Sequence, residues 1–254
     1  MNQGQALIIE DSETQARFIG RMFERENWRF TVAKSIEAAS YYLKQGPCHF
    51  ILLDVFLADM KTLPSIPHIR GLSINSALAV MTAGSQAEAI EETLRSARES
   101  QADYVLKKPF DGEQLRTILK EVEKDKKLGR RRPHALVVDD CRFVRHLTVG
   151  ALADNGYRVS EAKSMEEALA SPDIAHVDVV VTDIFMPGMG GIEGTRRIKA
   201  SWPRVKVVAM SAGLEDRMSG PKALLAARVT GADADLAKPF EPETLVKIVD
   251  ALVA

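Results

Sequence analysis

The stretch VVVTDIFMPGMGG, Val179–Gly191, carries a run of β-branched apolar residues into an aspartate and then into a loop of proline and glycine. Such a run is typical of a strand that is buried on both faces of a parallel sheet, and ligands gather at the carboxyl ends of such strands. Asp183 would then lie at the mouth of a sheet. Because an aspartate after a strand is more often a turn residue or a helix cap, the rest of the chain has to decide.

The composition is that of a globular protein. The 254 residues are 46% hydrophobic and 27% charged, enough for one large or two ordinary domains, and the formal net charge of -1 argues against an extended nucleic-acid surface. No apolar run approaches a membrane span, and the N-terminus lacks a signal pattern. The two cysteines, Cys48 and Cys141, form neither a disulfide framework nor a metal-binding spacing. We expect a cytoplasmic protein without nucleic-acid or membrane partners.

Four short motifs occur twice in the chain. ALIIED matches ALVVDD, HFILLD matches DVVVTD, ALAVMTAG matches VKVVAMSAG, and YVLKKPF matches ADLAKPF. The offset is 129 residues for the first three motifs and 130 for the fourth, over half of the chain. A period this long indicates two copies of a whole domain rather than a solenoid.

Each copy alternates short apolar runs with amphipathic stretches, the pattern of βαβ units around a parallel sheet. We therefore predict an α/β protein of two domains, residues 1–128 and 134–254, joined by a linker at 129–133. Strands in the first copy are expected at Ala6–Ile9, Phe30–Ala33, Phe50–Leu53, Leu78–Met81 and Tyr104–Lys107. Those in the second are expected at Ala135–Val138, Tyr157–Glu161, Val177–Thr182, Lys206–Met210 and Ala234–Ala237.

The segment before the linker should be a helix that packs on its own domain. Its apolar residues recur at i, i+3, i+4 and i+7: Leu115, Ile118, Leu119 and Val122. Asp111 is a plausible N-cap, and Gly129 stands where a C-cap glycine belongs. The basic run Arg130 to Pro133 is then a solvated connector, with phosphate binding as the minor alternative.

The repeated polar residues should meet at one edge of each sheet, because all follow the carboxyl ends of strands. The second copy offers three carboxylates, a hydroxyl and a cation: Asp139, Asp140, Asp183, Ser211 and Lys238. Three converging carboxylates would raise each other's pKa unless a cation joined them. Oxygen ligands without histidine or cysteine select a hard ion, and Mg²⁺ is the expected one.

This set of groups suits phosphoryl transfer. A metal and a lysine neutralise charge on the phosphoryl oxygens, a hydroxyl donates to one of them, and a carboxylate can attack in line. Aspartyl phosphate is a known covalent intermediate. The chemistry indicated is acceptance of a phosphoryl group on Asp183, and on Asp54 in the first copy.

Both halves resemble receiver domains of bacterial two-component response regulators. The resemblance rests on an acidic pair, an aspartate, a hydroxyl residue and Lys-Pro-Phe, which occur in that order in each half. The resemblance implies two flavodoxin-like (βα)5 domains of strand order 2-1-3-4-5, Mg²⁺ as cofactor, and a histidine kinase or histidine phosphotransfer protein as donor. Asp54 and Asp183 resemble the phosphoacceptors. The resemblance also implies that the Lys108–Pro109 and Lys238–Pro239 peptide bonds are cis.

The resemblance implies a role for each of the other site residues. Asp11 and Asp140 would bind the metal directly, with Glu10 and Asp139 assisting. The backbone carbonyls of Phe56 and Phe185 would complete the metal ligands. The phosphoryl oxygens would be bound by the two hydroxyls and the two lysines: Thr82, Ser211, Lys108 and Lys238.

Each of these residues alone has a plainer explanation. Lys238 could be a surface lysine before a proline, and Thr82 an ordinary hydroxyl at a strand end. Asp11 could cap the following helix, alone or in addition to a role in the site. The duplication at a fixed offset favours the site over these separate explanations.

The sequence departs from the family pattern in three places. The Met-Pro-Gly loop after the acceptor is kept at residues 186–188, but the first copy reads LADMK, 57–61, which puts the stiffness of that loop in doubt. The aromatic residue that many receivers place three positions before the lysine is replaced by Val105 and Asp235. The segment from hydroxyl to lysine is also about one helical turn longer than expected in both copies.

Two classes of function remain. The first is a signalling module without catalytic output, which takes phosphoryl groups and passes its state to a downstream protein; a variant of it is the front part of a longer regulator, such as a two-receiver diguanylate cyclase. We expect the last helix to end near Ala254, with no output domain after it. The second class, a phosphatase with an aspartate nucleophile, commonly needs an acid two residues after the nucleophile, where Phe56 and Phe185 stand. A purely structural pseudo-receiver stays possible for the first copy only.

Overall fold

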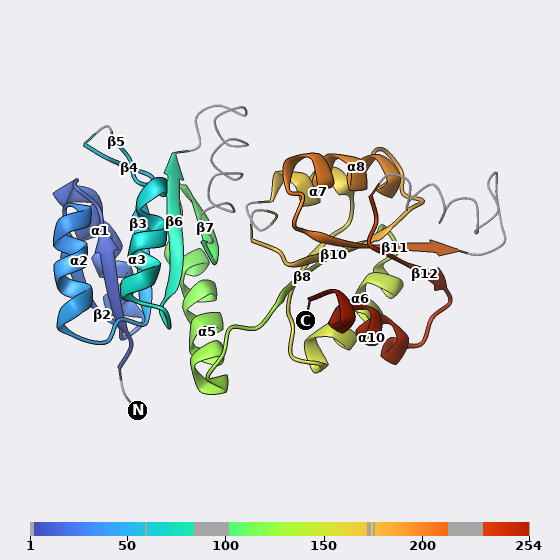
Figure 1. The fold of residues 1–254 in the computed structure, drawn as a ribbon, viewed down its shortest axis with the longest axis horizontal. Coiled ribbons are helices and arrows are strands. Elements are labelled where there is room, and N and C mark those ends of the chain that lie inside the picture. The colour runs from blue at the N-terminus through green and yellow to red at the C-terminus, as the bar shows by residue number, and fades with distance from the viewer. Residues whose placement is uncertain are drawn as a thin grey trace. The chain divides into compact units, whose positions relative to one another are not determined.

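A computed structural model describes residues 3–58, 60–83, 102–171, 174, 176–212 and 231–253. The chain divides into two compact units, Met1–Arg131 and Arg132–Ala254. Each unit is an α/β domain built on its own parallel five-stranded sheet (Figure 1).

The sheet of the first unit has the order β2-β1-β3-β6-β7, with every neighbouring pair parallel. Its strands are β1 Gln5–Ile9, β2 Arg29–Ala33, β3 Phe50–Asp54, β6 Ala77–Ala83 and β7 Tyr104–Lys108. Its described helices are α1 Glu13–Arg25, α2 Ile36–Gln45, the short 3-10 turn η1 Leu63–Ser65, α3 Ile66–Leu72 and α5 Gly112–Leu128. A small antiparallel hairpin, β4 Phe56–Leu57 and β5 Met60–Lys61, follows β3.

The second unit repeats this plan. Its sheet has the order β12-β11-β10-β8-β9, again parallel throughout. Its strands are β8 His134–Val138, β9 Arg158–Ala162, β10 Val179–Asp183, β11 Lys206–Ala212 and β12 Ala234–Lys238. Its described helices are α6 Arg142–Asp154, α7 Met165–Ala170, α8 Gly191–Ser201 and α10 Pro242–Val253. In both units the order is 2-1-3-4-5 when the five sheet strands are counted along the chain, as predicted.

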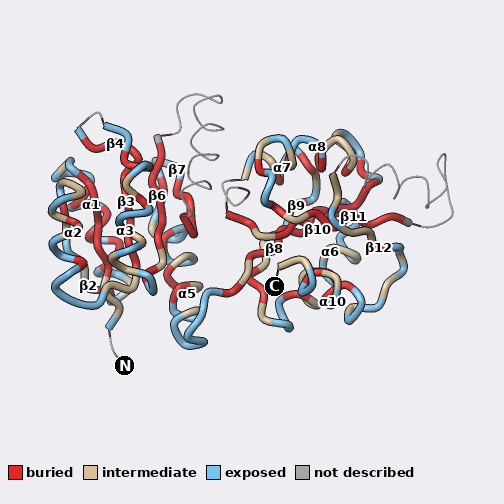
Figure 2. The backbone as a smooth tube through the Cα atoms, viewed as in Figure 1, coloured by how far each residue is buried: buried red, intermediate tan, exposed pale blue. Residues whose placement is uncertain are grey.

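Helices cover both faces of each sheet, and the strands between them are buried (Figure 2). In the first unit, Phe23 of α1 and Leu115 of α5 share one apolar cluster with Phe50 of β3. In the second, α6 and α10 pack on one face, and α7 and α8 lie together on the other (Figure 1). Because the central strands are covered on both sides, their sequences read as continuous apolar runs.

The predicted helix before the linker is confirmed as α5, with both of its ends. Asp111 accepts hydrogen bonds from the backbone of Glu113 and Gln114, and the Gln114 side chain returns a bond to the Asp111 amide, which completes a capping box. Gly129 ends the helix in the left-handed conformation, at φ 67°.

All ten predicted strands are present, with ends that differ by no more than two residues from those expected. The hairpin β4–β5 was not predicted. The extra length expected between hydroxyl and lysine falls largely on residues 84–101 and 213–230, outside the described residues. None of the described helices combines the length and the apolar character that a membrane crossing requires.

Candidate functional site

The strand register brings the repeated polar residues to one edge of each sheet. In the second unit Thr182 of β10 lies opposite Val138 of β8, so Asp183 and Asp139 come next to each other as the two strands end. On the other side, Asp183 lies opposite Met210 of β11, one residue before Ser211. Parallel strands thus place chemistry from distant parts of the sequence side by side.

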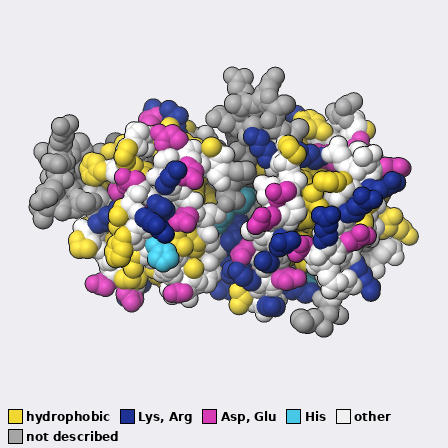
Figure 3. All heavy atoms as spheres, turned by 180° about the vertical axis from the view of Figure 1, so that it is seen from behind, with side chains coloured by type: hydrophobic (Ala, Val, Ile, Leu, Met, Phe, Trp, Pro, Cys, Tyr) yellow, Lys and Arg dark blue, Asp and Glu magenta, His cyan; other side chains and the backbone are white. Residues whose placement is uncertain are grey.

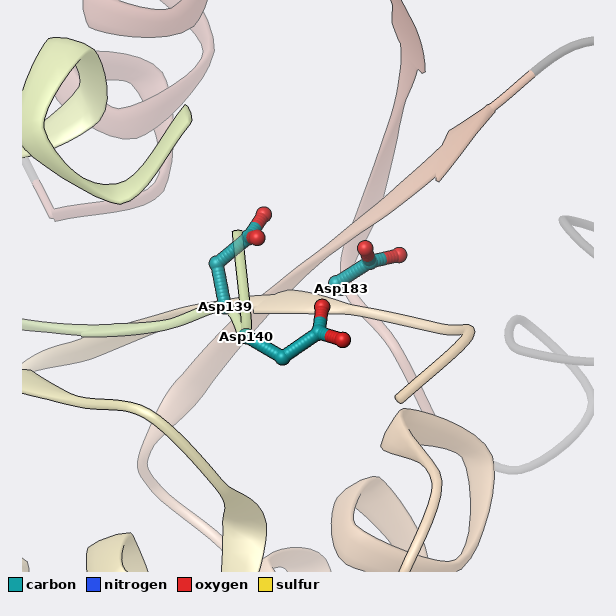
Figure 4. A group of neighbouring side chains, drawn as sticks. All are labelled: Asp139, Asp140 and Asp183. Carbon is teal, nitrogen blue, oxygen red and sulfur yellow. The ribbon is translucent and has the colours of Figure 1, made fainter. Parts of the chain in front are cut away.

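Three carboxylates converge at this edge of the second unit (Figure 4). Asp139, Asp140 and Asp183 each offer an oxygen, and these oxygens lie within 4.8 Å of one another. Asp139 is fully buried, whereas Asp140 is exposed. An all-oxygen set with an open side fits a hard divalent cation such as Mg²⁺.

Lys238 at the end of β12 supplies the positive charge of this edge. Its Nζ donates to Asp139 Oδ2 at 2.7 Å and to Asp183 Oδ2 at 2.7 Å. Ser211 on the neighbouring strand β11 is fully buried. The Lys238–Pro239 bond is cis, as is Lys108–Pro109, and both expectations are therefore confirmed.

Burial sets the electrostatics of this site. Burial raises the pKa of Asp183 above its usual value, although the hydrogen bond and charge of Lys238 and the Phe185 amide lower it in part. Burial by itself would lower the pKa of Lys238, but the hydrogen bonds and charges of Asp139 and Asp183 outweigh it and leave that pKa raised. The lysine therefore stays charged against its two carboxylates.

The loop after Asp183 is held by its backbone. The amide of Phe185 donates to Asp183 Oδ1 at 3.1 Å, and the amide of Met189 donates to Glu166 Oε1 of α7 at 2.7 Å. A Cβ on Gly191 would lie 2.0 Å from the Asp183 carbonyl oxygen, so only glycine allows this approach where α8 begins. The Gly188 backbone is left-handed, at φ 76°.

The first unit builds a related edge from Glu10, Asp54 and Lys108. Lys108 Nζ donates to Asp54 Oδ2 at 2.7 Å, to Glu10 Oε2 at 2.9 Å and to Gln15 Oε1 at 2.7 Å. Burial raises the pKa of Glu10, and the hydrogen bond from Lys108 opposes the rise. Thr82 is buried on β6.

Asp11 lies beside Glu10, and its carboxylate also contacts the loop after the acceptor. Its Oδ2 accepts a hydrogen bond of 2.8 Å from the amide of Ala58, in the turn of the hairpin β4–β5. This bond is the main cause that holds the pKa of Asp11 below its usual value. Within the described residues, the trio of the second unit is the only group of three carboxylates gathered closely enough to share an ion.

The expected capping role of Asp11 is wrong. Ser12 is the N-cap of α1, and its hydroxyl accepts from the Gln15 amide at 3.4 Å. Serine competes well for this position because its short side chain reaches the free amides of the first turn. Asp11 lies one residue too early and turns to the hairpin instead.

Two further candidate residues stand on the loops that follow the acceptors. Phe56 and Phe185, each two residues after an acceptor, are both 43% exposed, and each amide donates to the preceding aspartate at 3.1 Å. Val105 is buried within the first unit, and Asp235 is half-buried.

Sequence reasoning missed several contacts in these sites. Gln15 is a third partner of Lys108, Glu166 anchors the loop of the second unit, and Thr62 Oγ1 donates to the Asp54 carbonyl at 2.5 Å. Gln15 stands on the first turn of α1, shortly after the acidic pair. Its place on that turn was the one available signal that it could reach the lysine. Neither Thr62 nor Glu166 belongs to a motif that points to the site.

Comparison with known families agrees with this geometry. The model of the response regulator receiver domain matches residues 6–120 and again residues 135–250. The chain therefore belongs to the response regulator receiver family, and it carries two receiver domains, called below the first and second receivers.

Individual relatives match one receiver each. The chain is 33% identical over 118 residues to the CAI-1 autoinducer sensor kinase/phosphatase CqsS of Vibrio cholerae, which is 46% of this chain and 17% of that protein. It is 43% identical over 98 residues to the response regulator GacA of Pseudomonas viridiflava, covering 38% of this chain and 45% of that one. The chain thus spans half or less of the length of these curated relatives.

Solved structures give two kinds of match. The chemotaxis protein CheY4 of Vibrio cholerae matches with a TM-score of 0.42 and 29% identity, over 48% of this chain and 98% of that chain. A putative two-component system response regulator/GGDEF domain protein matches with a TM-score of 0.44 and 22% identity, over 98% of both chains.

Proposed function

We propose that this chain is a response regulator whose two receivers accept phosphoryl groups in a Mg²⁺-dependent reaction, principally on Asp183 and more slowly on Asp54. The signal then passes to a downstream protein through contacts of the receivers, without catalysis by the receivers themselves. Membership of the receiver family supports the general function. The residues and their ranking are our own inference from the geometry.

The observation that carries the proposal is the bridge made by Lys238. A single ammonium group lies 2.7 Å from Asp183 and 2.7 Å from Asp139, beside a third carboxylate at the same edge. A half-buried lysine placed between two acids is suited to receive the oxygens of an incoming phosphoryl group. The buried hydroxyl of Ser211 stands on the strand between those of Asp183 and Lys238 and is the proposed second donor.

Mg²⁺ would be held by Asp140 and Asp183 with Asp139 assisting and the Phe185 carbonyl as a further ligand, and it would neutralise charge on the phosphoryl oxygens. An oxygen of Asp183 attacks the phosphorus of the donor. The new O–P bond forms as the bond from phosphorus to the donor breaks, and the leaving group takes that electron pair. Lys238 stabilises the transferred oxygens throughout.

The first receiver keeps the acids, the hydroxyl and the lysine, and these support a competent acceptor at Asp54. Positioning differs, because its loop holds neither the proline nor the glycines of residues 187–191. A small misplacement can cost a large factor in rate where catalysis depends on positioning. We therefore rank Asp54 second.

A histidine kinase or a histidine phosphotransfer protein is the proposed donor, and a cytoplasmic protein the proposed target. The similarity to a protein named as a sensor kinase/phosphatase supports a kinase-linked pathway. On the face drawn in Figure 3, acidic side chains lie among the lysines and arginines. Together with the net charge of -1, this mixture favours protein partners over nucleic acid.

The proposal is tested by exposing the full chain to a small phosphodonor with Mg²⁺ or with a chelator, and mapping the modified residues by mass spectrometry. We expect Mg²⁺-dependent phosphate on Asp183 and less on Asp54. An Asp154→Asn variant, which changes an exposed aspartate at the end of α6, should be labelled like wild type.

Label on other residues, or label that forms equally well with the chelator, would contradict the proposed function. Steady release of inorganic phosphate from phosphomonoesters would instead favour the phosphatase. We expect none, because Phe56 and Phe185 occupy the positions where such enzymes commonly carry a second acid.

A further inference from the structure

The loop that follows the acceptor has a different backbone anchor in each receiver. In the second receiver the Met189 amide donates to Glu166 Oε1, which reaches over from α7. This anchor lies outside the group of metal ligands. Among the described residues, Asp140 accepts no hydrogen bond from the loop, and its carboxylate is free to face Asp139 and Asp183 (Figure 4).

In the first receiver the equivalent loop is the hairpin β4–β5, and its anchor is a metal ligand. The Ala58 amide donates to Asp11 Oδ2 at 2.8 Å, across 47 residues of sequence. Glu37 stands where Glu166 stands one repeat later, yet within the described residues it makes no hydrogen bond to the hairpin. One oxygen of the carboxylate proposed to bind the ion is thus taken by the loop.

The hairpin also follows a different path back to the next helix. Thr62, the equivalent of Gly191, fits its side chain against the Asp54 carbonyl and donates a hydrogen bond of 2.5 Å to it. In the second receiver, a Cβ at Gly191 would lie 2.0 Å from the matching oxygen. The two loops therefore cannot share one backbone conformation at this position.

We propose that the hairpin β4–β5 is an autoinhibitory contact of the first receiver: the Ala58 amide and a divalent cation compete for the carboxylate of Asp11. Mg²⁺ that binds through Oδ2 of Asp11 must break the bond to the hairpin. The metal is thereby coupled to the hairpin, whose exposed side chains include Phe56 and Met60. This inference rests on the proposed function, because it takes Mg²⁺ to be the cofactor of both receivers.

The size of the effect follows from the bond that is lost. A hydrogen bond from an amide to a carboxylate is stronger than one between neutral groups. We expect the first receiver to bind Mg²⁺ about tenfold more weakly than the second, equivalent to about 1.4 kcal/mol.

The test is an exchange of loops within the full chain. Residues 57–62, LADMKT, are replaced by MPGMGG, the six residues at 186–191. Mg²⁺ is titrated into wild type and variant while the amide signals of Phe56 and Phe185 are followed by NMR. These two amides report separately on the two sites, because each donates to its own acceptor at 3.1 Å.

The inference predicts that Phe56 responds at about tenfold higher Mg²⁺ than Phe185 in wild type, and that the exchange moves its midpoint toward that of Phe185. Equal midpoints in wild type, or a Phe56 midpoint that the exchange leaves unchanged, would overturn the inference alone. A Phe185 amide that ignores Mg²⁺ would instead count against the proposed function.

A point variant tests the same contact if the exchanged chain does not fold. Ala58 has φ 46°, a conformation that β-branched residues resist, so Ala58→Val should weaken the hairpin and lower the Mg²⁺ midpoint of Phe56. Met60→Leu changes a neighbouring side chain that is 73% exposed and should leave the midpoint unchanged. A midpoint that Ala58→Val does not lower, or that Met60→Leu lowers as much, would contradict the competition.

Discussion

Asp183 illustrates how a site residue can cost stability in order to be reactive. Its carboxylate is largely buried, and the interaction with Lys238 offsets only part of the free energy lost when the charged group leaves water. Burial therefore raises the pKa of Asp183 above the value in an unfolded chain. The folded protein binds a proton at this position more readily than the unfolded chain does.

The sign of this effect gives a prediction for Asp183→Asn in metal-free buffer. Above the folded pKa the buried charge is fully present and lowers stability; as pH falls through that pKa toward the unfolded value near 4, the cost disappears. The substitution should thus raise the Tm of the second receiver by a few degrees near neutral pH, with a smaller gain in acid.

Thermal unfolding of wild type and Asp183→Asn with a chelator, at about pH 7 and at about pH 4.5, measures the difference. A variant that is less stable than wild type at neutral pH would show that the bond to Lys238 outweighs burial. A gain that grows in acid would contradict the assigned cause.

At the scale of elements, the loops at the strand ends decide how well each site is formed. The start of α8 approaches the end of β10 so closely that a Cβ on Gly191 would meet the Asp183 carbonyl oxygen at 2.0 Å. Backbone atoms cannot move aside as a flexible side chain can. The close approach fixes the loop that presents Phe185.

Gly191→Ala should therefore destabilise the second receiver by about 2 kcal/mol or more and weaken its Mg²⁺ binding. Gly150→Ala is the matched control, because it stands within α6 with no atom within 4 Å of the new Cβ. Alanine there should stabilise by up to about 1 kcal/mol. Chemical denaturation of the two variants gives the comparison, and equal effects would show that the close approach is unimportant.

The strands and the charged edge could be predicted because their signals are local and duplicated. An apolar run that ends in a carboxylate specifies both a buried strand and a residue at its mouth. The hairpin could not be predicted in the same way, because β4 and β5 have two residues each and carry no turn dipeptide such as Asn-Gly. The contact of Ala58 with Asp11 depends on the backbone path between residues far apart in sequence.

At the scale of the whole molecule, the duplication gives each receiver its own sheet and its own apolar core. Each edge carries its own lysine, bonded to acids of the same receiver. Mutations at distant sites without shared partners act additively in most proteins. The two receivers should therefore bind metal independently of each other.

Asp140→Ala tests this independence. Asp140 is exposed and makes no hydrogen bond within the described residues, so its removal should abolish Mg²⁺ binding in the second receiver without unfolding it. Binding in the first receiver should stay as in wild type. Calorimetric titration counts the sites, and loss of both would mean that the receivers share or strongly couple them.

The ranking of the two acceptors is the central claim, and a phosphorylation time course tests it most directly. Wild type, Asp54→Asn, Asp183→Asn and the variant with both changes are incubated with a small phosphodonor at saturating Mg²⁺. Most of the fast incorporation should survive Asp54→Asn and disappear with Asp183→Asn, which should retain only a slow phase. The reverse pattern would contradict the ranking, and label that survives loss of both aspartates would contradict phosphorylation at these two residues altogether.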